Sequence, residues 1–197
     1  LQNPALYTNR ELSWLLFNKR VLSEARDKQL LLFERLKFLS ITASNLDEFF
    51  MVRIGSLVDM IHAEYTKKDI AGMSAKEQLD ALMEETHKFA ALQYSTYNRM
   101  LLPQLRANGL NFVEHHEQLT ERQAQYVDEY FEENVYPVLT PMAVDSSRPF
   151  PLIRNKTLNI GALVAKKGEK DTEIEFATVQ VPSVLPRVVR IPAAKEG

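Results

Sequence analysis

Residues 45–53 have the sequence Asn45-Leu46-Asp47-Glu48-Phe49-Phe50-Met51-Val52-Arg53, and they begin the most regular apolar stripe of the chain. Steps of three and four residues keep side chains on one face of an α-helix. The stretch therefore predicts an amphipathic helix and a helical fold for this part of the protein. The stripe has steps of four, four, three and four residues, at Leu46, Phe50, Ile54, Leu57 and Ile61.

The four residues before this stripe, Ile41-Thr42-Ala43-Ser44, predict a break or distortion of the preceding helix. β-Branched and hydroxyl side chains weaken a helix, because they lose rotamer freedom or compete for backbone hydrogen bonds. We therefore expect Asn45 at the start of a helix, accessible to solvent. The residues alone favour a helix cap, although amides at a helix start also bind anions or a nucleotide edge. Asp47 and Glu48 could form a metal-binding or general-base pair, but carboxylates that complement the helix dipole are the simpler interpretation.

Three other helix starts are predicted from capping boxes, in which two side chains three residues apart satisfy unpaired amides. They lie at Thr8–Glu11, Ser74–Glu77 and Thr120–Gln123. Pro103 and Gly109 are predicted to end the helix that begins near Ser74. We expect a helical bundle over the first half of the chain. Its predicted core includes Trp14, Leu36, Phe50, Ile54 and Leu82.

The pattern changes after Gly109. Prolines at positions 137, 141, 149 and 151 predict extended or looped chain. Alternating apolar side chains predict two strands, at residues 157–164 and 173–181, which the polar loop 166–172 joins as a hairpin. Val188, Val189 and Ile191 predict a third strand at an edge. The predicted fold class is α+β overall, with an all-helical domain over residues 1–108 and an incomplete mixed α+β domain over residues 109–197.

Composition excludes several classes of function. The 197 residues carry a net charge of −2 and no cysteine, so disulfides, thiol catalysis and thiolate metal sites are excluded. The balanced charge gives no reason to expect a nucleic acid partner. No segment has the roughly 20 consecutive apolar residues of a membrane span, and a cytoplasmic location is expected. Because the chain opens at Leu1 rather than Met and ends at Gly197 without a terminating element, we expect a fragment of a longer protein.

The residue types offer little catalytic chemistry. The six glycines are too scattered for a loop that cradles phosphate. His62 and His87 are best explained as solvated helical residues, and the adjacent His115 and His116 rarely converge on one metal. We assign no catalytic residue and no metal site. Several basic residues around the expected helix break could converge on a polyanion, although a solvated face is the simpler interpretation: Arg10, Arg20, Arg35, Lys37 and Arg53.

Three blocks of residues, in this order and at close spacing, resemble the long-chain bacterial polyphosphate kinase family. A weaker fourth block resembles the family's next domain, and the resemblance covers most of the chain. The three blocks are Glu11-Leu12-Ser13-Trp14 with Phe17-Asn18 and Arg20-Val21-Leu22, then Glu34 to Ile41, then Asn45 to Arg53, and the fourth is Arg148 to Leu152 with Asn155 to Asn159.

The resemblance implies an enzyme that reversibly adds the terminal phosphate of ATP to polyphosphate, through a phosphorylated histidine and with magnesium. It also implies a helical domain that caps the nucleotide, a head domain with dimer contacts in a homo-oligomer, and catalytic domains similar to phospholipase D. No histidine here is followed by the x-Lys pattern of those catalytic domains. The chain alone is therefore expected to be inactive. Asn45 is similar to the family's nucleotide-contacting asparagine, which makes it the predicted nucleotide-binding residue.

An alternative from another class stays open at this point. The same motifs could belong to a non-catalytic helical interaction module that kept them only for packing. The role of Asn45 distinguishes the two, because only a residue that contacts the base should affect the use of ATP.

Overall fold

We describe the protein from a computed structural model over residues 3–144, 150–165 and 174–192. The chain divides into two compact units, Leu1–Phe112 and Val113–Gly197, whereas the prediction placed the domain boundary between residues 108 and 109. The first unit is helical and the second combines helices with a three-stranded sheet, which confirms the predicted α+β class. In the part of the chain described, no helix is long and apolar enough to cross a membrane.

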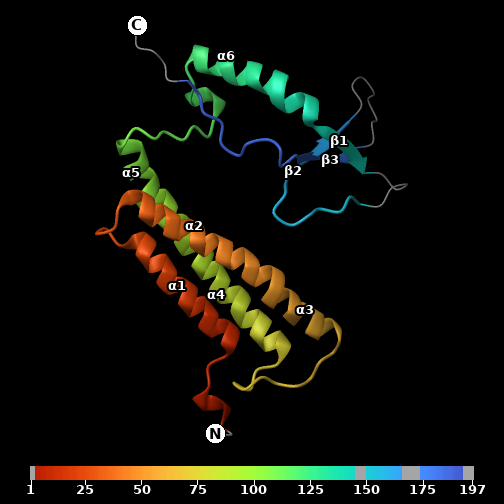
Figure 1. Ribbon diagram of the computed structural model, residues 1–197. Helices are drawn as coiled ribbons and strands as arrows, with labels where there is room; N and C mark the ends of the chain where they lie inside the picture. The colour runs from red at the N-terminus through yellow and green to blue at the C-terminus, as the bar shows by residue number, and fades with distance from the viewer. Residues whose placement is uncertain (1–2, 145–149, 166–173, 193–197) are drawn as a thin grey trace. The chain divides into compact units, whose positions relative to one another are not determined.

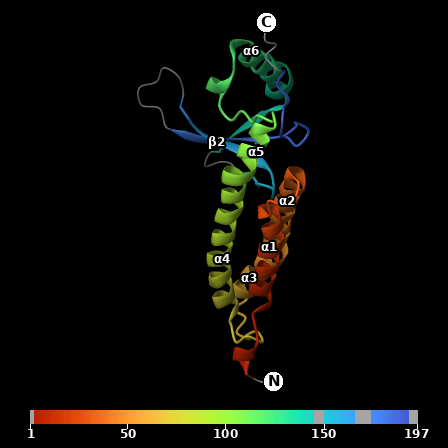
Figure 2. The same cartoon turned by 90° about the vertical axis from the view of Figure 1, so that its left-hand side faces the viewer.

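Three continuous helical segments form the first unit, and both views show them side by side (Figures 1 and 2). Helix α1 packs against α2 and α4, and α3 packs against α4. A 3-10 turn, η1 (Pro4–Leu6), precedes the first segment. The segments are α1 (Arg10–Arg26), then α2 (Leu32–Phe49) with the π-helix η2 (Phe50–Ile54) and α3 (Gly55–His62), and then α4 (Ala75–Thr96) with the π-helix η3 (Tyr97–Leu101) and α5 (Leu102–Ala107).

The core of this unit lies where the three segments face one another. Ile54 and Leu82 are buried as predicted, whereas Trp14, Leu36 and Phe50 are only half-buried. Two apolar clusters lie along α1, one toward each of its ends, so the helix contributes to the core over most of its length. The clusters are Leu15, Phe49, Ile54, Leu57, Ala75 and Leu82 in one, and Leu22, Ala25 and Phe89 in the other.

The start of α1 differs from the predicted capping box at Thr8. Asn9 is the cap, because its Oδ1 accepts hydrogen bonds from the backbone N–H groups of Glu11 and Leu12, both at 3.0 Å. The Glu11 carboxylate, which the box would require, is held by arginine side chains instead. The predicted capping boxes at the starts of α4 and α6 (Glu121–Tyr130) are confirmed.

The predicted break at residues 41–44 is wrong, because α2 passes through it without interruption. Thr42 is fully buried, with 0% of its surface exposed. Asn18 Nδ2 donates to the Thr42 carbonyl at 3.1 Å, and Gln93 Nε2 donates to Thr42 Oγ1 at 3.0 Å. These contacts from α1 and α4 stabilise the helix where its local propensity is weak. Asn45 therefore lies inside α2 and not at a helix start, and the helix-cap interpretation of this residue is wrong.

Distortion of the helices occurs instead at π-helical turns. Both η3 and η5 (Phe131–Val135) end two residues before a proline, at Pro103 and Pro137. A proline ring lacks the N–H donor and clashes with the preceding turn, so a wider turn accommodates it. The helix that contains Pro103 ends at Ala107, and Gly109 follows with a φ of +80°, a left-handed conformation that glycine adopts without strain.

An ion pair joins two of the packed helices. Lys19 Nζ of α1 lies 2.7 Å from Glu85 Oε2 of α4, and Lys88 pairs with the other oxygen of Glu85 at 2.9 Å. The hydrogen bond from Lys19, followed by that from Lys88, lowers the pKa of Glu85 to about 2. The stabilisation from this pair is therefore present at neutral pH. It is lost as the pH falls from the ordinary glutamate value through the lowered pKa.

Replacing Lys19 by Met should raise the pKa of the Glu85 carboxyl toward its ordinary value, because the largest source of the shift is removed. Carboxyl-carbon NMR titration of the folded chain measures this pKa directly. Lys37→Met is the matched control, since Lys37 pairs with Glu34 on another face. An unchanged Glu85 titration in the Lys19 variant would show that the two side chains do not pair in solution.

The second unit contains a three-stranded antiparallel sheet in the order β1-β3-β2. The predicted hairpin between β2 and β3 is confirmed, and its predicted loop at residues 166–172 lies outside the described residues. The predicted third strand at residues 188–191 is wrong, because the third strand is β1, in the proline-containing stretch. Pro141 is tolerated there because β1 is an edge strand. The strands are β1 (Thr140–Val144), β2 (Leu158–Val164) and β3 (Glu175–Val181).

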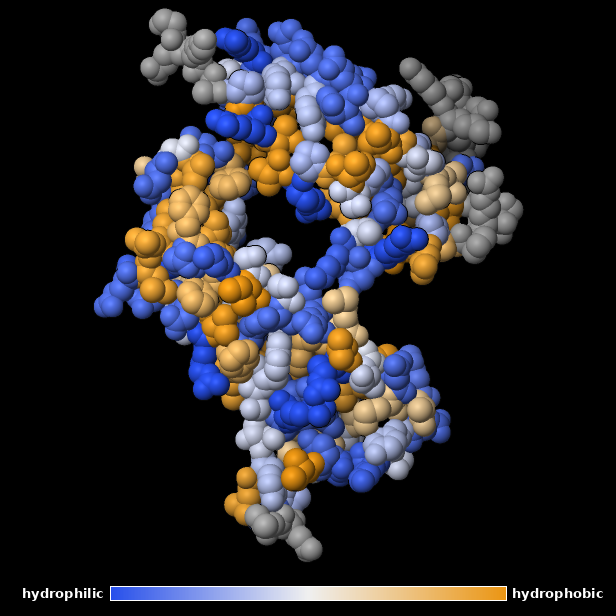
Figure 3. All heavy atoms as spheres, viewed as in Figure 1, coloured by the Kyte–Doolittle hydropathy of each residue, from blue (hydrophilic) through white to orange (hydrophobic). Residues whose placement is uncertain are grey.

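Apolar side chains reach the surface of the second unit, as Figure 3 shows in orange. Thr178 is the single buried residue among those described there. Ile160 and Val164 of β2 are 53% and 41% exposed. A sheet normally buries one apolar face against another layer of structure. This sheet therefore offers apolar surface that the described residues leave uncovered.

Candidate functional site

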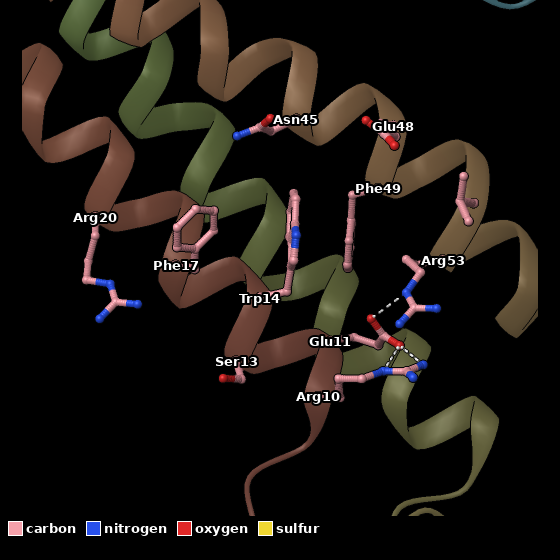
Figure 4. Close-up of a pocket in the computed structure, with 11 residues that line it drawn as sticks. Arg10, Glu11, Ser13, Trp14, Phe17, Arg20, Asn45, Glu48, Phe49 and Arg53 are labelled. Atoms are coloured by element: carbon pink, nitrogen blue, oxygen red, sulfur yellow. Dashed lines mark hydrogen bonds and ion pairs between the residues drawn. The ribbon is translucent and has the colours of Figure 1, made fainter.

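A groove of about 670 Å³ lies between α1 and the continuous segment α2–η2, and we call it the α1–α2 groove (Figure 4). All of its lining belongs to the first unit, and the motif at residues 45–53 supplies one wall. The α1 wall consists of Arg10, Glu11, Ser13, Trp14, Phe17 and Arg20, and the other wall consists of Asn45, Glu48, Phe49, Val52 and Arg53.

The two walls follow from helical spacing. Most lining residues of each helix are separated by three, four or seven positions, so they share one face. The adjacent faces of the same helices carry the apolar core, and Phe49 belongs to both. Each helix therefore packs with one face and presents another to the groove.

Aromatic rings form the floor of the groove. Trp14 stacks on Phe49 with ring centroids 4.3 Å apart and an angle of 8° between the planes. Figure 4 shows these two rings edge-on and parallel, with Phe17 on the other side of Trp14. Phe49 is buried, whereas Phe17 is 47% exposed. One face of the Trp14 indole is thus covered by Phe49, and the other face is directed toward the groove.

Three arginines place positive charge around these rings. The Glu11 carboxylate, which is almost buried, accepts from Arg10 Nη2 at 2.6 Å and from Arg53 Nε at 3.2 Å, as Figure 4 shows. Arg20 lies over the Phe17 ring, with its guanidinium carbon 6.0 Å from the ring centroid. Glu11 therefore fixes two guanidinium groups, one from each wall, at the edge of the groove.

Asn45 lies on the α2 wall of the groove and is half-buried. Its Nδ2 donates to Asn18 Oδ1 at 3.1 Å, and this is its single side-chain hydrogen bond with the described residues. The position inside α2 differs from the predicted helix start. The predicted binding residue nevertheless lies in a groove with aromatic and cationic side chains.

The basic residues singled out in the sequence separate into two groups. Arg10, Arg20 and Arg53 line the groove. Arg35 is buried elsewhere, where its Nε donates to the Ala25 carbonyl at 3.0 Å, and Lys37 pairs with Glu34 on the surface. Only three of the five therefore converge. The spacing of these arginines along each helix predicts which of them share a helical face. It does not predict that the two helices pack side by side and bring those faces together.

Asp47 and Glu48 lie near the carboxyl end of α2, so the dipole interpretation of these carboxylates is wrong. Glu48 lines the groove. The four histidines are exposed, and the groove lining includes none of them.

A magnesium site does not fit the groove. Of its two carboxylates, Glu11 is engaged by two arginines, and Glu48 is a single ligand. Within residues 3–144, 150–165 and 174–192, no three His, Asp or Glu side chains are grouped as a metal would require.

Comparison with known protein families gives a match over both units of the chain. Residues 7–113 match the family model for the polyphosphate kinase N-terminal domain, and residues 122–197 match the model for the polyphosphate kinase middle domain. The chain belongs to the polyphosphate kinase family. A polyphosphate kinase of Lactiplantibacillus plantarum is 53% identical to it over 188 residues, and one of Halalkalibacterium halodurans is 47% identical over 193 residues.

The match with solved structures covers the same regions. The crystal structure of polyphosphate kinase from Porphyromonas gingivalis has a TM-score of 0.73 and 31% identity, over 95% of this chain and 27% of that one. The curated relatives are covered to a similar extent. The match with the Lactiplantibacillus plantarum protein covers 95% of this chain and 26% of that protein, and the match with the Halalkalibacterium halodurans protein covers 98% and 27%. The chain therefore spans about a quarter of the length of its relatives.

Proposed function

We propose that this chain supplies the nucleotide cap of a polyphosphate kinase, with the α1–α2 groove as the part that receives the base of ATP. The full-length enzyme would reversibly transfer the terminal phosphate of ATP to polyphosphate through a phosphorylated histidine. The observation that carries the proposal is the position of Asn45 in one groove with Trp14 and three arginines. Histidine and magnesium chemistry are assigned to other parts of the full-length enzyme.

The aromatic floor suits a nucleobase. The open face of Trp14 offers a flat apolar surface, and stacking of a base on an aromatic ring contributes about 1–3 kcal/mol. Phe17 lies on the same side of Trp14, where it can flank the bound base (Figure 4). Stacking on an aromatic ring does not distinguish one base from another. Selectivity for adenine therefore requires a polar side chain that contacts the edge of the base. Asn45 is the uncharged polar side chain of the α2 wall.

The arginines suit the phosphates of the nucleotide. In the lining of the groove three arginines outnumber the two glutamates, which leaves a net positive charge. Because Glu11 holds Arg10 and Arg53 in place, less conformational entropy is lost when an anion binds. The groove therefore combines base stacking with attraction for the phosphate chain.

The alternative, a helical interaction module that kept the motifs only for packing, is not favoured. The chain belongs to an enzyme family over both of its units. A residue kept only for packing would also be expected to face the core, whereas Asn45 lines an open groove.

Replacing Asn45 by Ala in the full-length enzyme should raise the KM for ATP by about 3- to 10-fold, the value of one hydrogen bond. The KM for polyphosphate should not change. The kinetics of ATP and polyphosphate, measured with the same preparation, test this. Because Asn45 lies inside a helix, alanine favours the local backbone, and the loss of a helix cap does not contribute to the result.

Ser44→Ala is the matched control, because Ser44 is an exposed polar residue of the same helix outside the groove lining. It should leave both constants unchanged. An Asn45→Ala enzyme that is folded and has unchanged ATP kinetics would refute the nucleotide contact.

We further propose that the second unit contributes contacts to a homo-oligomer. The support is its uncovered apolar surface, together with the head-domain role that the resemblance implies.

A cytoplasmic location is proposed from the absence of cysteine.

A further inference from the structure

A line of hydrogen bonds runs from the buried backbone of α2 to the groove. Asn18 Nδ2 donates to the Thr42 carbonyl at 3.1 Å, and Asn18 Oδ1 accepts from Asn45 Nδ2 at 3.1 Å. Asn18 and Thr42 are both 0% exposed, whereas Asn45 lines the groove. A fully buried amide thus connects a fixed backbone group with the side chain that meets the ligand.

The Thr42 carbonyl determines the direction in which hydrogen bonds are donated along this chain of side chains. A backbone carbonyl only accepts hydrogen bonds, so Asn18 must direct its NH2 group toward Thr42 and its oxygen toward Asn45. Asn45 must then donate to Asn18 with its own NH2 group. The reverse orientation of Asn45 would place two acceptor oxygens together and would lose a hydrogen bond in a buried position.

The fixed orientation leaves two groups of Asn45 for a ligand. They are the Oδ1 acceptor and the second N–H of the amide. An adenine edge offers the complementary pair, an amino group that donates at position 6 and a ring nitrogen that accepts. Hypoxanthine, the base of inosine triphosphate, has the same fused rings as adenine, but it has a carbonyl at position 6 and an N–H at position 1. A fixed amide therefore distinguishes these two bases, although a freely rotating amide accommodates both.

We infer that Asn18 is a positioning residue that holds the Asn45 amide in the orientation that selects an amino-bearing purine. The inference rests on the proposed nucleotide groove. Asn18 acts through Asn45, because it is buried and does not line the groove itself. It lies on α1, so the packing of α1 against α2 is directly connected to the choice of base.

The test compares ATP with inosine triphosphate as substrates of the full-length enzyme. Asn18→Leu removes the acceptor and frees the Asn45 amide to rotate. It should lower the ratio of kcat/KM for ATP to kcat/KM for inosine triphosphate by about 3- to 10-fold, the value of one hydrogen bond. Asn18→Asp should retain the ratio, because a carboxyl that burial keeps protonated still donates to the Thr42 carbonyl and presents an oxygen acceptor to Asn45. A purely structural role predicts that the ratio is unchanged in both variants, whatever happens to their stability.

Gln93→Leu is the matched control, because it removes a neighbouring hydrogen bond to Thr42 without touching Asn45. It should leave the ratio unchanged. Thermal denaturation shows that each variant is folded at the assay temperature. If the leucine protein does not fold, Asn18→Ala removes the same acceptor without added apolar bulk, and the same drop in the ratio is expected.

Asn45→Ala, measured in parallel, separates this inference from the proposed function. If Asn45→Ala lowers the ratio and folded Asn18→Leu or Asn18→Ala does not, the positioning role of Asn18 is overturned and the groove stands. If Asn45→Ala changes neither ATP kinetics nor the ratio, the proposed groove itself fails. A drop in the ratio for Asn45→Ala and Asn18→Leu, with Asn18→Asp and Gln93→Leu unchanged, establishes the inference.

Discussion

The 197-residue chain on its own is expected to make no polyphosphate from ATP, at any concentration of protein. Phosphoryl transfer needs a positioned nucleophile as well as groups that stabilise charge. The α1–α2 groove offers arginines for charge, but its lining contains no histidine. The scattered glycines provide no loop for the phosphates. Incorporation of radiolabelled terminal phosphate into polymer, with chain purified from a host without polyphosphate kinase, measures this activity.

The full-length enzyme, purified in the same way, is the positive control for this assay. Adding the chain to the full-length enzyme should not abolish synthesis, which excludes an inhibitor in the preparation. Synthesis by the purified chain, with a KM for ATP that rises in its Asn45→Ala variant, would contradict the assignment of catalysis to other parts of the enzyme.

Replacing Trp14 by Ala in the full-length enzyme is expected to raise the KM for ATP by roughly 5- to 150-fold. The range corresponds to the loss of base stacking, at about 1–3 kcal/mol for one base. Trp14 also stacks on Phe49, so the variant should be less stable and must be assayed below its unfolding temperature. The KM for polyphosphate should stay near that of the unchanged enzyme.

Two substitutions distinguish stacking from a general loss of structure. Trp14→Phe keeps an aromatic face and should restore most of the affinity for ATP. Phe33→Ala removes a 61% exposed aromatic ring of the same unit outside the groove and should have no effect on ATP. An equal loss in Trp14→Ala and Trp14→Phe, with both proteins folded, would argue against a base on this ring.

Patterns formed by residues close together in the sequence predicted those helix starts and strands that depend mainly on neighbouring residues. The capping box at Ser74 and the alternating pattern of β2 and β3 depend on near neighbours in sequence, and both are confirmed. The helix through residues 41–44 depends instead on Asn18 and Gln93, which lie on other helices. Single-helix propensity contains no information on such contacts, so the sequence predicted a break that tertiary packing prevents.

The strand at Thr140–Val144 could not be predicted for a related reason. Pro141 argues against a central strand, and only the position of β1 at the sheet edge makes it acceptable. The order of strands is set by pairing with β3, which is distant in sequence. The same proline pattern is compatible with a loop, so the sequence alone does not distinguish the two.

The sequence points to only part of the candidate site. The family motif predicts Asn45, which lies in the groove, whereas Trp14 is predicted only as a core residue and Phe17 and Asn18 have no individual role in the prediction. Trp14 has both roles, because one face packs on Phe49 and the other faces the groove. A helical face with aromatic and basic residues at steps of three and four is the signal that could have identified this wall.

Photoaffinity labelling of the full-length enzyme with 8-azidoadenosine triphosphate tests the nucleotide groove most directly. The azide is attached to the base, so the modified peptide reports where the base lies. The account predicts labelling within residues 10–20 or 45–53, competition by ATP, and reduced labelling in Asn45→Ala. Labelling that ATP displaces, but that maps only outside these two segments and is unaffected by Asn45→Ala, would contradict it.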